Sequence, residues 1–304
     1  MAYDAYGSDD ALNLRELPDP KVGPGEVRIR VRRAGVNPVD WKVMSGGLDG
    51  LMDAVFPVIP GWDVAGIVES VGIDTPEFEV GDEVVAYARK DVVHGGTFAE
   101  LVTMSVRGVA RKSAALSWEE AGGLPLAGLT ALQTLDRLVV SASDTVLVHG
   151  GAGGVGALTV QLAKARGARV IATASPANHE FLSDLGATPV AYGDGVVERI
   201  REVAPDGVDV VADFVGAVRD VTMAVLAGGG RHASIADSTV LETGGAWFWV
   251  RPSAEGLTEL GRIADAGQLH VPVAEVLPLE ELAAAFARSR EGHVRGKLVI
   301  SVSD

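Results

Sequence analysis

The sequence predicts an α/β protein of two domains, one mostly antiparallel β, the other a parallel sheet covered by helices on both faces. Three observations support this prediction. The chain has 304 residues, which is too long for a single hydrophobic core. The pattern of predicted elements changes near Leu124, from short β-rich segments to alternating strands and helices. A glycine-rich segment follows the first strand after that change and opens a helix.

Four short β-rich segments precede Leu124, and turns that contain glycine separate them. Antiparallel strands joined by hairpins produce this spacing, and such strands can close into a partial barrel. The segments are Glu26–Arg33, Asp63–Val71, Glu83–Ala88 and Thr97–Thr103.

Strands and helices alternate after Ser143. Thr145–His149 is β-rich, and apolar residues then recur at helical spacing over Val155–Ala165. Strands that alternate with helices lie parallel in one doubly wound sheet, with helices on its two faces. The further strand candidates are Arg169–Thr173, Pro189–Tyr192, Val208–Phe214, Arg231–Ile235 and Ala246–Val250.

The chain after Pro252 returns to mixed character and ends in a predicted strand, Lys297–Val302. Because a lone terminal strand needs a sheet to join, we expect this tail to pack back onto the first domain. The expected domains are therefore 1–122 together with 252–304, and 123–251. The tail is also expected to hold a helix to Ala266, a strand at Val271–Val276 and a helix from Leu279 to about Arg290.

Composition and charge argue against several classes of protein. Hydrophobic residues make up 47% and charged residues 22%, a globular composition. The net charge of −15 and the absence of a long basic run argue against nucleic acid and anionic membranes as partners. The absence of cysteine excludes disulfides and thiolate zinc ligands. Neither a signal peptide nor an apolar span is recognisable, so we expect a cytoplasmic protein.

The segment from Val146 to Gly156 carries the strongest functional signal. Gly151, Gly153 and Gly156 have the G-x-G-x-x-G spacing after a predicted strand. In dinucleotide sites these glycines permit a tight turn, close approach of the pyrophosphate and close helix packing, and the helix N-terminus attracts phosphate. The alternative is a glycine-rich turn that binds nothing. The predicted contacts are Gly151, Ala152, Gly153, Gly154, Val155 and Gly156.

NADPH is predicted over NADH. A site for NADH usually places an acidic residue about 20 residues after the glycine motif, to bind the ribose hydroxyl. The corresponding stretch, Ile171–Ser175, contains no acid. A carboxylate there would repel a 2′-phosphate, so its absence leaves room for NADPH. Ser175, His179 and Tyr192 are predicted to donate hydrogen bonds to that phosphate.

Six short motifs follow one another along the chain: Ala34–Asp40, Pro57–Gly66, Val80–Val84, Gly96–Glu100, Leu129–Ala131 and Ala152–Gly156. Together they resemble the motifs of medium-chain dehydrogenases/reductases, specifically the zinc-free quinone oxidoreductase branch. The resemblance runs almost end to end. It implies a GroES-like N-terminal domain, a Rossmann domain with a six-stranded sheet, and a cofactor cleft between them. It also implies hydride transfer from NADPH to a quinone or another electron-poor conjugated carbonyl compound.

This chain departs from the zinc-containing branch at the ligand positions. Asn37 stands where those enzymes have a cysteine, Trp62 where they have a histidine, and Asp63 is the acid beside it. The six histidines are scattered without metal-ligand spacing. We therefore expect no metal, and zinc-assisted alcohol oxidation is disfavoured.

The resemblance also implies site residues. Asn37, Pro38 and Asp40 are expected beside the nicotinamide; the alternative is a turn in which Asp40 caps the next helix. Lys42 stands where related quinone reductases often have a tyrosine, so a charged residue is expected to reach the pocket. Asp40 and Lys42 are candidates for orientation or proton supply.

Further cofactor contacts are expected from both domains. Cofactors of parallel sheets bind at the carboxyl ends of strands, which favours Phe214, Val215, Ser234 and Ile235. Thr130 resembles a hydroxyl that the family places near the cofactor, with a role as a small helix residue as the alternative. Arg295 and Lys297 resemble a closing motif that neutralises phosphate, with a solvated surface role as the alternative.

The sequence leaves two alternative functions, and it also predicts an oligomer. The nearer function is an enoyl or alkenal reductase, and the more distant is a non-catalytic NADPH-binding sensor or structural protein. The apolar, aromatic segment Ala246–Val250 predicts an edge strand that needs covering. We expect a homodimer that joins two sheets there, as the resemblance also suggests; the alternative is a strand buried by its own chain.

Overall fold

The computed structural model describes residues 1–303 and divides into two compact units. Unit 1 comprises Met1–Leu129 and the tail from Pro252, and unit 2 comprises Thr130–Arg251. This boundary lies inside helix α3 (Pro125–Arg137), whereas the sequence predicts it between residues 122 and 123. None of the helices in the described residues combines the length and apolar character that crossing a bilayer requires.

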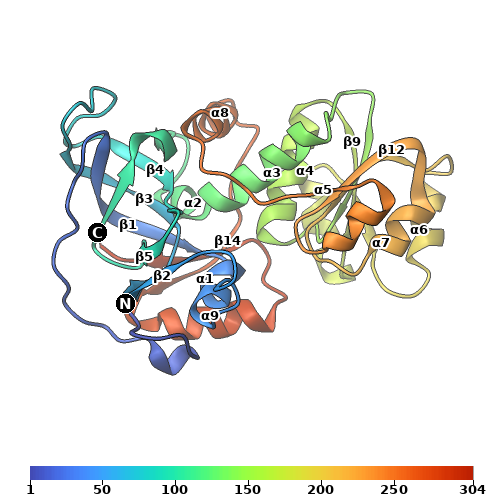
Figure 1. Cartoon of the computed structure of the whole chain (residues 1–304). Helices are drawn as coiled ribbons and strands as arrows, with labels where there is room; N and C mark the ends of the chain where they lie inside the picture. Colours follow the sequence, from blue (N-terminus) through green and yellow to red (C-terminus); the bar gives the residue numbers. More distant parts are fainter. Residues whose placement is uncertain (304) are drawn as a thin grey trace. The chain divides into compact units, whose positions relative to one another are not determined.

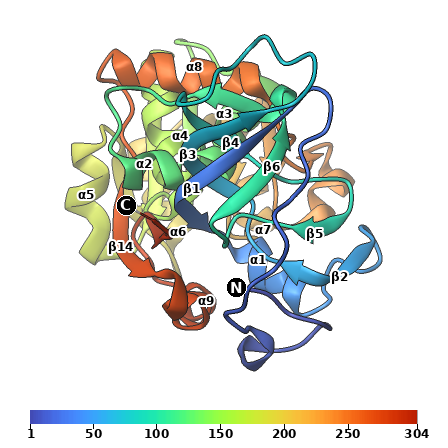
Figure 2. The same ribbon diagram turned by 90° about the vertical axis from the view of Figure 1, so that its left-hand side faces the viewer.

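Unit 1 is built on a seven-stranded sheet in the order β14-β15-β1-β3-β4-β7, with β6 paired to β1 (Figure 2). All neighbours are antiparallel except β14 and β15, which confirms the predicted mostly antiparallel domain. In β1, buried Val27, Ile29 and Val31 alternate with arginines, the period of a half-buried strand. The strands are β1 (Glu26–Val36), β3 (Asp63–Val71), β4 (Glu83–Tyr87), β6 (Leu101–Ser105), β7 (Val109–Arg111), β14 (Val273–Pro278) and β15 (Lys297–Ser301).

Shorter elements surround this sheet. The N-terminus lies beside β2, where Tyr3 and Val58 exchange backbone hydrogen bonds of 2.9 Å (Figure 2). Parallel strands β2 and β5 form a separate two-stranded sheet. The elements are η1 (Asp9–Ala11), α1 (Pro38–Met44), β2 (Ala54–Ile59), β5 (Val93–Gly95), η2 (Val106–Gly108), α2 (Trp118–Gly123), α8 (Ala254–Asp265), η5 (Leu279–Glu281) and α9 (Leu282–Glu291).

Unit 2 is a six-stranded sheet in the order β10-β9-β8-β11-β12-β13, and every pair is parallel. This confirms the predicted Rossmann-like sheet and places all carboxyl ends of its strands at one edge. The strands are β8 (Thr145–His149), β9 (Arg169–Ala174), β10 (Thr188–Ala191), β11 (Val208–Asp213), β12 (Leu226–Ser234) and β13 (Ala246–Trp247).

Helices cover both faces of this sheet. Figure 1 shows α4 on one face and α6 with α7 on the other. Buried Leu147 packs with Ile200 of α6 and Val225 of α7 on one face. Its neighbours Val146 and Val148, which point to the other face, are also buried, so both faces of β8 are apolar. The helices are α4 (Gly154–Ala165), η3 (Pro176–Asn178), α5 (His179–Asp184), α6 (Val196–Val203), α7 (Arg219–Val225) and η4 (Ser238–Thr243).

The edge strand is shorter than predicted, because only Ala246 and Trp247 of the segment 246–250 pair with β12. The chain then turns toward α3. The Gln133 side chain binds both the N–H and the C=O of Arg251, at 3.0 and 2.8 Å. Phe248 lies under the guanidinium of Arg137. These contacts draw the backbone away from the sheet ladder.

Candidate functional site

The glycine loop of unit 2 joins β8 to α4 and has little space for side chains. A Cβ on Gly151 would lie 2.7 Å from the Ala172 Cβ, and one on Gly156 would lie 2.1 Å from the Gly150 carbonyl oxygen. Gly150 has φ of +74°, where glycine is favoured. On Gly153, by contrast, a Cβ would meet only one atom within 4 Å. The loop is therefore tight toward the protein at Gly151 and Gly156 and open at Gly153.

Thr173 of β9 holds this loop in place. Its carbonyl accepts the Gly151 N–H at 2.9 Å, and its Oγ1 accepts the Gly150 N–H at 3.3 Å. The same Oγ1 lies 3.2 Å from Nδ1 of buried His149. Burial lowers the pKa of His149 to about 4, so this imidazole is neutral at neutral pH. Neither residue was singled out from the sequence, because the glycine motif does not name its supports.

The other predicted cofactor contacts of this sheet follow the carboxyl ends of its strands. Tyr192 and Val215 are exposed, whereas the hydroxyl of Ser234 is buried and donates to Asp213 Oδ2 at 2.7 Å. Nε2 of His179 is buried without a hydrogen-bond partner. The residues at this edge are Ser175, His179, Tyr192, Phe214, Val215, Ser234 and Ile235.

Arg199 of α6 is a cation at this edge that sequence reasoning missed. Its Nε donates to the Ala191 carbonyl at 3.0 Å, and its Nη2 donates to the Tyr192 carbonyl at 3.3 Å. Ser175, His179 and Tyr192 were the residues predicted for the 2′-phosphate, and the helix that follows Tyr192 was not considered. Arg199 lies on the following helix and reaches back to the turn.

The glycine loop fits a dinucleotide. Helix α4 has twelve residues, and its N-cap is Gly153, which offers no side-chain acceptor to the amides of the first turn. Those amides and the positive end of the helix dipole would attract a phosphate, and Gly153 leaves space for a pyrophosphate to approach.

Unit 1 contains a buried cluster of four polar side chains, Asn37, Asp40, Asp63 and Lys297. The Asn37 side chain donates from Nδ2 to Asp63 Oδ2 at 2.8 Å, and its Oδ1 accepts from Lys297 Nζ at 2.5 Å. Lys297 Nζ also lies 3.6 Å from Asp63 Oδ2. The Asn37 N–H donates to Asp40 Oδ2 at 2.8 Å. β1 pairs with β15 through Val36 and Leu298, which brings Lys297 beside Asn37.

Burial sets the charges in this cluster. It raises the pKa of Asp40 to about 8, although the Asn37 N–H opposes the rise. Burial also raises the pKa of Asp63 to about 6, against the attraction of Lys297, and lowers the pKa of Lys297. Lys297 and Asp63 lie within ion-pair distance, and the raised pKa of Asp40 favours its neutral acid form at neutral pH.

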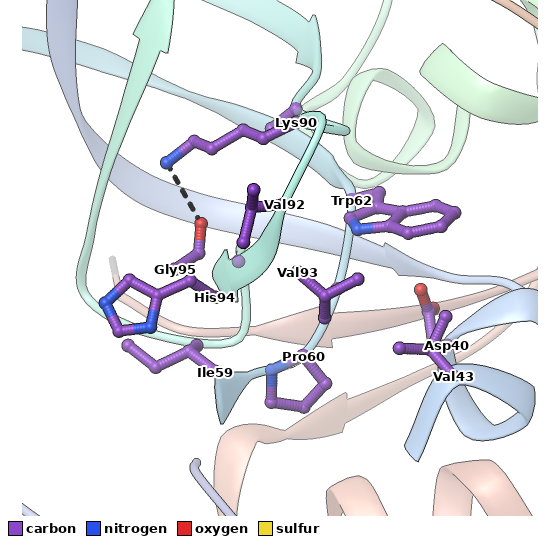
Figure 3. A pocket seen from close by; sticks show the side chains of 13 residues that line it. Asp40, Val43, Ile59, Pro60, Trp62, Lys90, Val92, Val93, His94 and Gly95 are labelled. Carbon is purple, nitrogen blue, oxygen red and sulfur yellow. Dashed lines mark hydrogen bonds between the residues drawn. The ribbon is translucent and has the colours of Figure 1, made fainter. Parts of the chain in front are cut away.

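Asp40 also lines a pocket within unit 1 (Figure 3). Its Oδ1 is buried and has no hydrogen-bond partner. The space of about 320 Å³ includes the open mouth of the pocket, and most of the side chains that line it are apolar. Lys90 and His94 are the other polar side chains that line it, and neither was singled out from the sequence. The lining residues are Asp40, Val43, Ile59, Pro60, Gly61, Trp62, Ala88, Lys90, Val92, Val93, His94, Gly95 and Gly96.

The remaining predicted site residues take other places. Pro38 begins α1, and Asp40 accepts a hydrogen bond from the Asn37 N–H at the start of that helix, so the predicted capping contact is present. Lys42 is exposed, with Nζ 5.4 Å from the centre of the Trp41 ring, and does not line this pocket. Thr130 is buried in α3, and Arg295 is exposed.

The solvated surface role considered for Lys297 is wrong. Its side chain is buried, and the strand that carries it, β15, lies between β1 and β14. Nζ donates to the Val36 carbonyl at 2.9 Å as well as to Asn37.

Comparisons with known proteins agree with this architecture. A family model described as an alcohol dehydrogenase GroES-like domain matches residues 23–114, and one described as a zinc-binding dehydrogenase matches residues 185–300. The NADPH-dependent alkenal/one oxidoreductase of Arabidopsis thaliana is 34% identical over 308 residues, covering 98% of this chain and 78% of that protein. The 2-methylene-furan-3-one reductase of Solanum lycopersicum is 34% identical, with the same coverage of 98% and 78%. The solved quinone oxidoreductase of Coxiella burnetii has a TM-score of 0.88 and 33% identity, covering 99% and 98% of the two chains.

Zinc is implied by the description of one family model, and the residues of unit 1 do not fit it. The indole of Trp62 donates only, and the amide of Asn37 is engaged by Lys297 and Asp63. The ammonium of Lys297 would repel a metal cation at Asp63. Within residues 1–303, no group of three or more histidine, aspartate or glutamate side chains is placed to hold a metal ion.

Proposed function

We propose that this chain, which belongs to the medium-chain dehydrogenase/reductase family of oxidoreductases, uses NADPH to reduce a quinone or another electron-poor conjugated carbonyl compound. The observation that carries the proposal is the pocket of unit 1, which is lined by apolar side chains and a few polar ones, with an unpartnered buried carboxyl oxygen of Asp40 at one side. Apolar walls suit a flat conjugated acceptor, and a few placed polar groups orient it.

The coenzyme is assigned to the glycine loop. Gly151–Gly156 would hold the pyrophosphate on backbone amides, with Ser175, His179 and Tyr192 near the 2′-phosphate. The turn that carries Tyr192 is bound by the cation Arg199, which supports NADPH over NADH. When bound, NADPH supplies the hydride.

Asp40 favours the reduction of a conjugated C=C bond as a second candidate. That reaction needs a proton at carbon after the hydride has added, and carbon is protonated by a placed acid. Asp40 holds its proton at neutral pH, and Asn37 fixes its other oxygen at 2.8 Å. The O–H of Asp40 donates the proton to the carbon next to the carbonyl, and water then restores the acid. A reduced quinone takes its proton on oxygen, where water suffices.

We also propose a homodimer through the edge of the unit 2 sheet. β13 is the last strand of that sheet, Trp247 is 46% exposed on it, and Leu241 and Trp249 are exposed nearby in sequence. Light scattering at micromolar concentration is expected to give the mass of two chains, and Trp247→Lys is expected to give one. A monomer in the unmodified protein would contradict this assembly.

The experiment for the reaction compares acceptors at saturating coenzyme. NADPH and NADH oxidation are followed by absorbance with naphthoquinones, straight-chain enones and saturated ketones of equal length. We expect turnover with NADPH and the conjugated compounds, and none with the saturated ketones. Tight binding of NADPH without turnover on any acceptor would overturn the proposal and favour the sensor alternative. Zinc-dependent alcohol oxidation would overturn it as well.

A further inference from the structure

Lys90 follows β4 and lines the pocket of unit 1. Figure 3 shows its side chain at the end of the pocket away from Asp40, with Trp62, Val92 and Val93 between them. Its Nζ donates to the Gly95 carbonyl at 3.2 Å. Among the described residues that line the pocket, it is the only lysine or arginine, and within residues 1–303 it forms no ion pair. An ammonium has three N–H donors, so Lys90 can donate further hydrogen bonds to a ligand.

The surroundings of Lys90 oppose its charge. Burial lowers the pKa of its ammonium, and the attraction of Glu26 only partly offsets this. A cation that lies among apolar side chains loses hydration, and one hydrogen bond to a neutral carbonyl makes up only part of that loss. An anion that binds the cation supplies a stronger, charge-assisted hydrogen bond. Lys297, the lysine of the buried cluster, already has Asp63 as its counter-ion.

We propose that Lys90 binds a carboxylate on the acceptor, so that the enzyme prefers conjugated carbonyl compounds with a negative charge remote from the bond that is reduced. This inference rests on the proposed function. Since Asp40 and Lys90 lie at opposite ends of the pocket, an elongated acceptor can place its reacting end near one and its acidic end near the other.

The test uses a matched pair of acceptors: a straight-chain methyl enone that ends in a carboxylate, and its methyl ester. We expect kcat/KM to be about 10- to 100-fold higher for the acid than for the ester, the range of a charge-assisted hydrogen bond. Lys90→Met is expected to remove this preference while retaining activity on the ester, and Lys90→Arg to retain the preference. Lys21→Met, an exposed lysine of unit 1, is the matched control and leaves the ratio unchanged.

Binding provides a second measurement without turnover. The saturated keto acid should bind the coenzyme-free protein more tightly than its ester by calorimetry, and Lys90→Met should abolish the difference. Equal kcat/KM for acid and ester in the unmodified enzyme would overturn the inference, whatever the variants do. A parallel loss on both compounds in a folded Lys90→Met protein would also overturn it, since Lys90 would then only support Gly95. Absence of turnover on every conjugated acceptor would instead contradict the proposed function.

Discussion

The carboxyl edge of the unit 2 sheet and the pocket of unit 1 differ in the kind of chemical group that they offer a ligand. At the sheet edge the chemistry lies in the backbone: glycines that exclude side chains and amides at the start of α4. In unit 1 it lies in ionisable side chains removed from water, Asp40, Asp63 and Lys297. Adding a side chain to the glycine loop should therefore weaken coenzyme binding. In unit 1, a substitution that removes a charge or a proton but keeps the shape of the side chain should be enough to impair activity or stability.

The largest expected effect is on catalysis. Asp40→Asn keeps the shape of the side chain and removes the acidic proton, and should lower kcat on neutral enones by about 100- to 10,000-fold. The reduction of quinones, which take protons on oxygen, should change far less. Steady-state rates for both acceptor types check this. Asp91→Asn, an exposed carboxylate near the pocket in sequence, is the matched control. Equal rates of Asp40→Asn and unmodified enzyme on enones would remove Asp40 as an acid.

Lys297→Met should lower the free energy of unfolding by about 3–5 kcal/mol, because it leaves the buried carboxylate of Asp63 without its counter-ion. The double variant Lys297→Met/Asp63→Asn should recover most of the loss, because it removes the unpaired charge as well. Urea denaturation of the three proteins provides the measurement. A single variant as stable as the parent would show that the ion pair is not what compensates Asp63.

Gly156→Ala should weaken NADPH binding by up to about 100-fold, since overpacking of this kind costs about 1–3 kcal/mol. The added Cβ would lie 2.1 Å from the Gly150 carbonyl oxygen and displace the amides of the loop. Gly228→Ala in the same unit is the control, because a Cβ there meets nothing within 4 Å. Coenzyme titration by fluorescence checks the difference. Unaltered affinity in Gly156→Ala would mean that the loop does not hold the pyrophosphate.

The pH dependence should follow Asp40. With its pKa raised from 3.8 to about 8, its acid form prevails below that value, so kcat on a neutral enone should fall about tenfold per pH unit above it. Between these two pKa values the folded chain binds more protons at this group than the unfolded chain, so its contribution to stability declines as pH rises. Rates and denaturation between pH 5 and about 9 measure both, and Asp40→Asn should flatten the contribution of this group to each.

The smallest expected effect concerns the coenzyme. Ser175→Glu places a carboxylate near the expected 2′-phosphate, and repulsion between two charges that stay fully solvated costs about 1 kcal/mol, roughly a fivefold rise in KM for NADPH. The KM for NADH should stay constant or fall. Ser175→Gln is the uncharged control of equal size. A fivefold rise in that control too would indicate a steric effect.

The same contrast explains what could be predicted. The alternation of strands and helices and the glycine loop are local patterns, so the sheet of unit 2 and its loop were predicted from the sequence. The cluster of unit 1 joins Asn37, Asp63 and Lys297, which are far apart along the chain and meet only through the pairing of β1 with β3 and β15. Lys90 and Arg199 were not predicted as site residues, because neither belongs to a sequence motif and only the fold brings each to its site.

Unit 2 lies within the sequence of unit 1, and this order has a consequence for synthesis. When the last residue of unit 2 has left the ribosome, unit 1 still lacks β14 and β15 and the ammonium of Lys297. Unit 2 can close its sheet while the chain is still growing, whereas Asp63 must wait for the final strand before it is neutralised. Until then, the GroES-like unit lacks the partner of residues Arg33–Val36 of β1, so the backbone groups of this segment have no ladder to join.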